Sequence, residues 1–210
     1  MHTQETDEPG LIARICDGEK ELFHELIRPY EKRVYLSALA MLGNQPEAED
    51  AAQEALLKAF RGLKSFRGES KFSTWLLSIA MNEARSRLRN SKRAPLESLD
   101  EQADLHQGDF TPAVLTDWRE IPSETLERAE LRATLQSAVE GLPPIYREVF
   151  TLRDLDELNV EDTARILGVS ANVVKVRLHR ARMLLQKRLV PVLKSSFAPR
   201  RGWFGRASWR

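Results

Sequence analysis

Residues 159–188 read NVEDTARILGVSANVVKVRLHRARMLLQKR, a stretch that predicts two short helices separated by a turn. Asn159 is placed to cap the first helix, with Asp162 three residues on as its capping-box partner. Gly168 suits the left-handed conformation that ends a helix, and Ser170 can cap the helix that follows. The pattern indicates a helix-turn-helix.

The second helix of this pair has one apolar side and one polar side. At about 100° per residue, the apolar residues that fall together are Val174, Leu178, Ala181 and Leu185. The other side and its edges carry Asn172, Lys175, Val176, Arg177, His179 and Arg180. Such a helix can enter a major groove and place polar groups on base edges and cations on phosphates. A cationic helix on a solvated bundle is the alternative, but turn, caps and basic face together favour DNA binding.

Charge is distributed unevenly along the 210 residues, although the net charge is only +1. Residues 163–210 hold twelve Lys and Arg and no Asp or Glu, which leaves 20 basic against 31 acidic residues in 1–162. Because neutralised phosphates drive nucleic-acid affinity, polyanion binding is expected at the C-terminal end.

Other features restrict the class of protein. Cys16 is the single cysteine, so an internal disulfide and a thiolate metal cage are excluded. The four histidines lack ligand spacing, so neither a metal nor another cofactor is expected. No apolar run approaches the roughly 18 residues of a membrane span, and the first ten residues, MHTQETDEPG, have neither the basic start nor the apolar core typical of a signal peptide. We therefore expect a cytoplasmic protein without membrane insertion.

The N-terminal part has helical periodicity. A short helix is expected before Gly18, then one long helix over residues 19–42 with a kink at Pro29. The next helix starts near Pro46 and carries an acidic outer face. A further helix over about 72–92 begins apolar and ends basic, after the loop SFRGESKF. The aromatic residues of this loop and helix, Phe66, Phe72 and Trp75, suit stacking on the bases of single-stranded nucleic acid, and they suit a small helical core equally well.

Two further segments differ in composition. Residues 94–122 hold seven acids and one arginine and lack periodicity, which predicts an acidic flexible linker. Residues 191–210 form a basic tail with four aromatic residues, for which solvated disorder and contact with an acidic surface both remain open. The prediction is an all-α chain of two small helical domains, 11–93 and 123–190. The second is a four-helix domain that holds the helix-turn-helix.

Two separated blocks together resemble one family. EAEDAAQEALLKAFRGLKSFRGESKFSTWLLSIAMNEARSRLR (47–89) and LPPIYREVFTLRDLDELNVEDTARILGVSANVVKVRLHRAR (142–182) are similar to bacterial RNA polymerase sigma factors of the extracytoplasmic-function (ECF) group in the sigma-70 family. Both blocks in this order are far more specific than either alone. The resemblance covers residues 11–93 and 123–190.

The resemblance implies a role for each block. The first domain would bind core polymerase and recognise and melt the minus-ten element, and the second would read the minus-thirty-five element. Core contacts would be Asp50, Gln53 and Glu54. Minus-ten contacts would come from Phe66, Arg67, Ser70, Lys71, Phe72, Asn82 and Arg85. Val176 stands where serine is usual and could contact only a thymine methyl group.

The implied function is promoter-specific initiation of transcription at stress or envelope-response genes. The partners would be core RNA polymerase and promoter DNA. The resemblance leaves open whether an anti-sigma factor is a third partner. A transcription regulator of another class, dimeric on an operator, is the alternative and should bind duplex DNA without core polymerase. An enzyme is not expected, because no phosphate-binding loop, nucleophile elbow or HExxH-type motif occurs.

Overall fold

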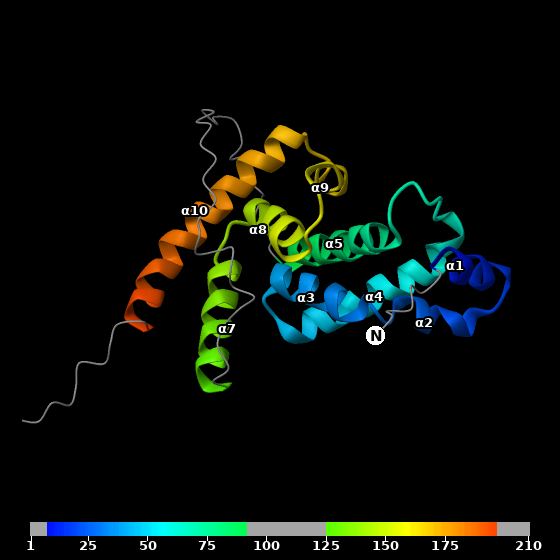
Figure 1. Ribbon diagram of the computed structural model, residues 1–210, viewed down its shortest axis with the longest axis horizontal. Helices are drawn as coiled ribbons and strands as arrows, with labels where there is room; N and C mark the ends of the chain where they lie inside the picture. Colours follow the sequence, from blue (N-terminus) through cyan, green and yellow to red (C-terminus); the bar gives the residue numbers. More distant parts are fainter. Residues whose placement is uncertain (1–7, 92–124, 197–210) are drawn as a thin grey trace, which may run out of the picture.

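The computed structural model describes residues 8–91 and 125–196, with side chains over 8–90 and 133–190. All regular elements in these ranges are helical, as predicted (Figure 1). The predicted linker (94–122) and the tail beyond residue 196 lie outside the described residues. None of the described helices combines the length and apolar character needed to cross a membrane. We call residues 8–91 the N-terminal unit and residues 125–196 the C-terminal unit.

Three long helices form the centre of the N-terminal unit. Its elements are α1 (Glu8–Asp17), a 3-10 turn (Lys20–Leu22), α2 (Phe23–Ile27), α3 (Glu31–Leu42), α4 (Gln45–Gly62), a 3-10 turn (Leu63–Ser65) and α5 (Phe72–Ser91). Helices α3, α4 and α5 all pack against one another. Alanines on α4, among them Ala51, Ala55 and Ala59, are fully buried, and their small side chains let the helices approach closely.

The prediction of one long helix over residues 19–42 is wrong. Helix α2 ends at Ile27 and α3 begins at Glu31, with Tyr30 donating its backbone N–H to the Ile27 carbonyl at 2.8 Å. Pro29 has no N–H to continue the helical ladder, and its ring clashes with the preceding turn. The chain therefore breaks at Pro29, where only a kink was expected.

The C-terminal unit contains the predicted helix-turn-helix. Its elements are α7 (Thr125–Glu140), α8 (Pro144–Phe150), a π-helical turn (Thr151–Leu155), α9 (Val160–Leu167) and α10 (Ala171–Ser196). Asn159 accepts the Asp162 N–H at 2.7 Å through its side chain, and Ser170 accepts the Val173 N–H at 3.3 Å. Gly168 has φ 68°. Both caps and the left-handed glycine are confirmed.

Helix α10 runs past the predicted end of its domain at residue 190 and continues through Pro191 to Ser196. Its apolar stripe explains part of this length, because Leu189 is buried one turn beyond Leu185 and packs in the same cluster as Ala138 of α7. Helix α10 therefore lies along both α7 and α8.

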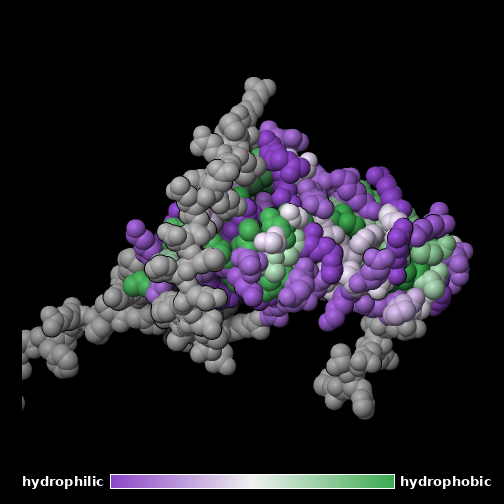
Figure 2. All heavy atoms as spheres, turned by 90° about the horizontal axis from the view of Figure 1, so that it is seen from above, coloured by the Kyte–Doolittle hydropathy of each residue, from purple (hydrophilic) through white to green (hydrophobic). Residues whose placement is uncertain are grey.

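The two units pack against each other. Helix α3 contacts α7, α8 and the π-helical turn, and α5 contacts α9 (Figure 1). Figure 2 shows hydrophilic side chains over most of the described surface on one face, with hydrophobic patches between them. Among the side chains that the structure describes, the large hydrophobic ones that stay exposed are Leu36, Leu57 and Met183.

Candidate nucleic-acid interface

The predicted upstream-element surface lies along the first half of α10. The four predicted core residues of this helix are all buried, as expected: Val174, Leu178, Ala181 and Leu185. Asn172 and Lys175 are exposed, whereas Val176, Arg177, His179 and Arg180 are partly buried. Arg180 donates to the Tyr146 hydroxyl of α8 at 3.3 Å. Asn172 and Lys175 are therefore the most accessible of the six predicted contacts.

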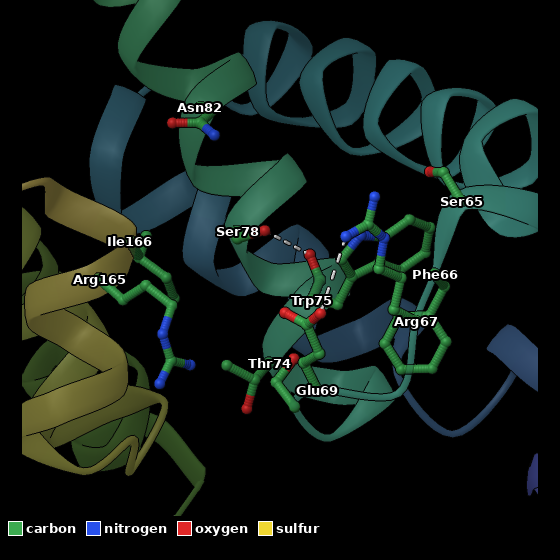
Figure 3. A pocket seen from close by; sticks show the side chains of 11 residues that line it. Ser65, Phe66, Arg67, Glu69, Thr74, Trp75, Ser78, Asn82, Arg165 and Ile166 are labelled. Carbon is green, nitrogen blue, oxygen red and sulfur yellow. Dashed lines mark hydrogen bonds and ion pairs between the residues drawn. The ribbon is translucent and has the colours of Figure 1, made fainter.

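A pocket of about 520 Å³ lies between the loop after α4, helix α5 and helix α9 (Figure 3). Four predicted minus-ten residues line it, namely Phe66, Arg67, Ser70 and Asn82. An unstacked base is bound by ring stacking and by hydrogen bonds to its edges. Aromatic walls beside hydroxyl, amide and guanidinium groups supply both kinds of contact.

Packed aromatic rings hold the loop in place. The Phe66 ring lies 5.8 Å from Phe72 and 5.2 Å from Trp75, measured between ring centroids, and Phe72 also meets Tyr30 at 5.7 Å. Phe72 is only 2% exposed. In this conformation it cannot offer a ring face to DNA and supports the loop from beneath, while Phe66 and Trp75 line the pocket. Trp75 therefore has two roles, one in packing and one in the pocket wall.

The other predicted minus-ten residues lie apart from the pocket lining. Lys71 is exposed. Arg85 on α5 points toward the C-terminal unit, where its Nε lies 3.2 Å from a Glu148 carboxylate oxygen. Burial raises the pKa of Glu148, while Arg85 and Arg177 oppose that rise. Arg85 is thus engaged by a carboxylate of the other unit.

The acidic face of α4 is exposed at Asp50 and Gln53 and partly covered at Glu54. Two of its carboxylates have a basic neighbour within the chain. A carboxylate oxygen of Asp50 lies 3.8 Å from Arg87 on α5, and one of Glu54 lies 4.0 Å from Lys58. Long, solvent-exposed pairs of this kind contribute about 0–1 kcal/mol and leave the carboxylates accessible to a partner.

Sequence reasoning missed the residues that join the units. Arg165 and Ile166 of α9 face the α5 side chains across the pocket (Figure 3). Asp156 is buried against Arg33 and Ser37 of α3. No short-range pattern reveals such pairs, because the partners come from helices far apart in the sequence: Arg33 and Ser37 are more than 100 residues from Asp156. The sequence holds one weaker signal for these contacts. Arg147 stands among regularly spaced apolar residues, and a charged side chain that is buried with them needs a partner.

The side chains described here do not include a group of three or more His, Cys, Asp and Glu arranged to hold a metal ion.

Family models and known proteins match both units. The model "Sigma-70 region 2" matches residues 26–94, and "Sigma-70, region 4" matches residues 132–185. The RNA polymerase sigma-H factor of Pseudomonas aeruginosa is 35% identical over 198 residues, covering 93% of this chain and 100% of that protein. The ECF RNA polymerase sigma factor SigW of Bacillus subtilis is 34% identical, covering 85% of this chain and 94% of that protein.

A solved structure is also similar. The sigma factor RpoE from Bartonella quintana, in complex with the anti-sigma factor NepR, has a TM-score of 0.59 and 25% sequence identity. The similarity covers 80% of this chain and 96% of that chain.

Proposed function

This chain belongs to the sigma-70 family of RNA polymerase sigma factors, in its extracytoplasmic-function (ECF) group, and we propose on that premise which surfaces carry its function. A sigma factor binds core RNA polymerase and directs promoter-specific initiation without catalysis of its own. Family membership sets aside the operator-binding regulator of another class. The remaining question is which side chains meet core polymerase and which meet each promoter element.

The pocket beside Phe66 is the proposed site for an unstacked minus-ten base. The observation that carries this proposal is the convergence of Phe66, Arg67 and Asn82 on one pocket from two elements. Asn82 and Ser70 provide donors and acceptors for a base edge, and Arg67 and exposed Lys71 suit the adjoining phosphates. Phe72 acts through the loop that it supports.

Helix α10 is the proposed reading helix for the minus-thirty-five element. Exposed Asn172 and Lys175 lie in its first turns, where a helix that enters the major groove meets base edges. Val176 adds an apolar contact for a thymine methyl group, and His179, Arg180 and Arg177 follow on the same half of the helix. Arg180 would exchange its Tyr146 contact for DNA.

The acidic face of α4 is the proposed contact for core polymerase, through Asp50, Gln53 and Glu54. Leu57, which is 48% exposed, lies one turn further along the same helix and gives this face an apolar end. A mixed face of this kind fits a basic partner helix with apolar positions. In such a contact the partner's basic groups would pair with Asp50 and Glu54, so neither carboxylate would be buried without an opposite charge.

Two further assignments rest on the relatives. We place the protein in the cytoplasm, because core polymerase is its partner. An anti-sigma factor is a proposed third partner, since the similar RpoE was solved with NepR. Genes of a stress or envelope response are the proposed targets, as is typical of the group.

Transcription from genomic DNA tests the proposal. Purified core polymerase is incubated with and without the chain, and the 5′ ends of the transcripts are mapped. We expect a small set of start sites that require the chain and share two upstream elements. The Asn82→Ala variant should lose activity when the minus-ten element is intact and duplex, yet retain binding to core polymerase. Start sites identical with and without the chain would contradict the proposal.

A further inference from the structure

Helix α1 lies outside the residues that the family models match, yet it packs against the loop of the proposed minus-ten site. The region 2 match begins at residue 26, after the end of α1. Leu11 and Ile15 of α1 are buried in the same cluster as Phe72, the first residue of α5. Helix α1 also contacts the 3-10 turn that leads from α4 into this loop (Figure 1). The helix is therefore part of the support of the loop.

Tyr30 connects α1 to Phe72 by one polar contact and one ring contact. Its hydroxyl donates a hydrogen bond to the carboxylate of Glu8, in the first turn of α1. Its ring meets the Phe72 ring with the centroids 5.7 Å apart and the planes at 62°, which is an edge-to-face arrangement. The energy of such a pair depends on the orientation of both rings. Glu8 therefore fixes the orientation of the ring that packs on Phe72.

Phe72 passes this constraint on to the wall of the pocket. Its ring stands edge-to-face with Phe66, with the centroids 5.8 Å apart and the planes at 83°. It is also tilted against Trp75, at 5.7 Å. Phe66 and Trp75 line the pocket, whereas Phe72 and Tyr30 lie behind them. Because closely packed rings leave little free space, a shift of Phe72 would displace the two rings on which a base would stack.

The hydrogen bond adds an anchor that ring packing alone does not provide. Glu8 and Tyr30 are both partly buried. A hydroxyl that donates to a carboxylate forms a stronger bond than one that donates to a neutral group, and the loss of either partner leaves the other unpaired. Phenylalanine in place of Tyr30 would keep the ring and lose only this anchor. The contribution of the hydroxyl can therefore be separated from that of the apolar core.

We propose that Glu8 and Tyr30 are positioning residues for capture of the minus-ten base, because they hold the loop after α4 in the shape that receives it. The proposal rests on the function proposed above for the pocket. Neither residue lines the pocket, so both act through Phe72 and Phe66. Such preorganisation lowers the cost of capturing the base. It leaves the reading of the upstream element unaffected, because α10 belongs to the C-terminal unit.

The test compares promoter opening with upstream binding in the holoenzyme, which is core polymerase with the full chain. The variants are Tyr30→Phe, Glu8→Ala, Glu8→Gln and the combination of Tyr30→Phe with Glu8→Ala. Tyr35→Phe is the matched control, because it removes a hydroxyl from α3, the helix that begins directly after Tyr30. Thermal denaturation verifies that each variant is folded, and co-elution verifies that each binds core polymerase.

Opening is measured with a fluorescent adenine analogue in the minus-ten element of a mapped promoter, which brightens when it is unstacked. We expect Tyr30→Phe and Glu8→Ala each to lower the equilibrium constant for opening about 3- to 10-fold, as for the loss of one hydrogen bond. Affinity for a duplex upstream element should not change. Glu8→Gln keeps an acceptor oxygen and should retain most of the opening. The double variant should be no worse than either single variant, since both remove the same contact.

Three results would overturn the proposal. Tyr30→Phe could open the promoter as well as wild type or the Tyr35→Phe control, its opening and upstream binding could fall together, or the effects of Tyr30→Phe and Glu8→Ala could add in full. Wild-type holoenzyme that opens no promoter would reject the proposed function, and this proposal with it. Equal opening by wild type and Tyr30→Phe would reject only the positioning role.

Discussion

Closure of the two units should weaken as pH rises, and Asp156 should account for most of the change. Burial raises the pKa of Asp156 from 3.8 to about 6, although the Ser37 hydroxyl and Arg33 oppose the rise. In the open form this carboxyl group returns to water and its ordinary pKa. The closed form therefore holds the proton more tightly. Its extra stability is fully present below about pH 4 and is lost as pH rises through about 6.

The two pKa values set the size of the effect. Their difference of about two units corresponds to roughly 3 kcal/mol over the full pH range. Between pH 5 and pH 8 the closed form should lose about 1.4 kcal/mol, which is a tenfold fall in the closing constant. Asp156→Asn keeps a hydrogen-bond acceptor for Ser37 and removes the titration. It should therefore remove this tenfold dependence, leaving a weaker slope of the same sign from Glu148, whose pKa is also raised by burial.

Energy transfer between two dyes measures the closing constant directly. In a Cys16→Ser background, cysteines at exposed Glu49 and Lys187 carry the dyes, one on each unit. Closing is followed in a urea series at each pH from 5 to 8. Asp17→Asn, an exposed carboxylate far from the interface, should keep the wild-type slope. An Asp156→Asn variant whose closing constant keeps the full wild-type pH dependence, or closure that strengthens as pH rises, would refute the reasoning.

Three other predictions concern separate parts of the molecule. Asp50→Lys should weaken co-elution with core polymerase by about tenfold or more, whereas Glu21→Lys, at an exposed position outside α4, should not; equal effects would reject the docking face. Val176→Ser should change the ranking of single-base variants of the upstream element in a binding assay, since a hydroxyl reads a base edge that a methyl group cannot. The exposed Met183→Ser is its control, and an unchanged ranking would remove Val176 from the base contacts. Gly168→Ala should lower the free energy of unfolding by about 1–2 kcal/mol in thermal denaturation, because its φ of 68° is a left-handed conformation that an L side chain disfavours. A Cβ at this position would meet nothing within 4 Å, so this backbone strain is the whole expected cost. Unchanged stability would show that the turn can relax.

Local signals in the sequence were sufficient for much of the fold. The Asn159 cap, the Gly168 turn and the Ser170 cap each depend on residues within four positions, and all three are confirmed. The buried stripe of α10 follows from helical geometry alone and is confirmed as well. Pro29 shows the limit of periodicity, because the apolar spacing continues across it while the backbone cannot.

The site was predicted less completely because it depends on contacts between distant parts of the chain. Phe66 and Asn82 were identified by resemblance and do line one pocket. The burial of Phe72 and the engagement of Arg85 could not be predicted, because each is set by where the neighbouring element packs. The same holds for Asp156, whose partners on α3 are more than 100 residues earlier.

Promoter opening tests the central claim most directly. A chemical probe of unpaired thymines, applied to a mapped promoter, is compared for core polymerase alone, the chain alone and the two together. We expect reactive thymines in the minus-ten element only when both are present, and their loss in the Asn82→Ala variant. Equal reactivity with core polymerase alone, or none with the two together, would contradict it.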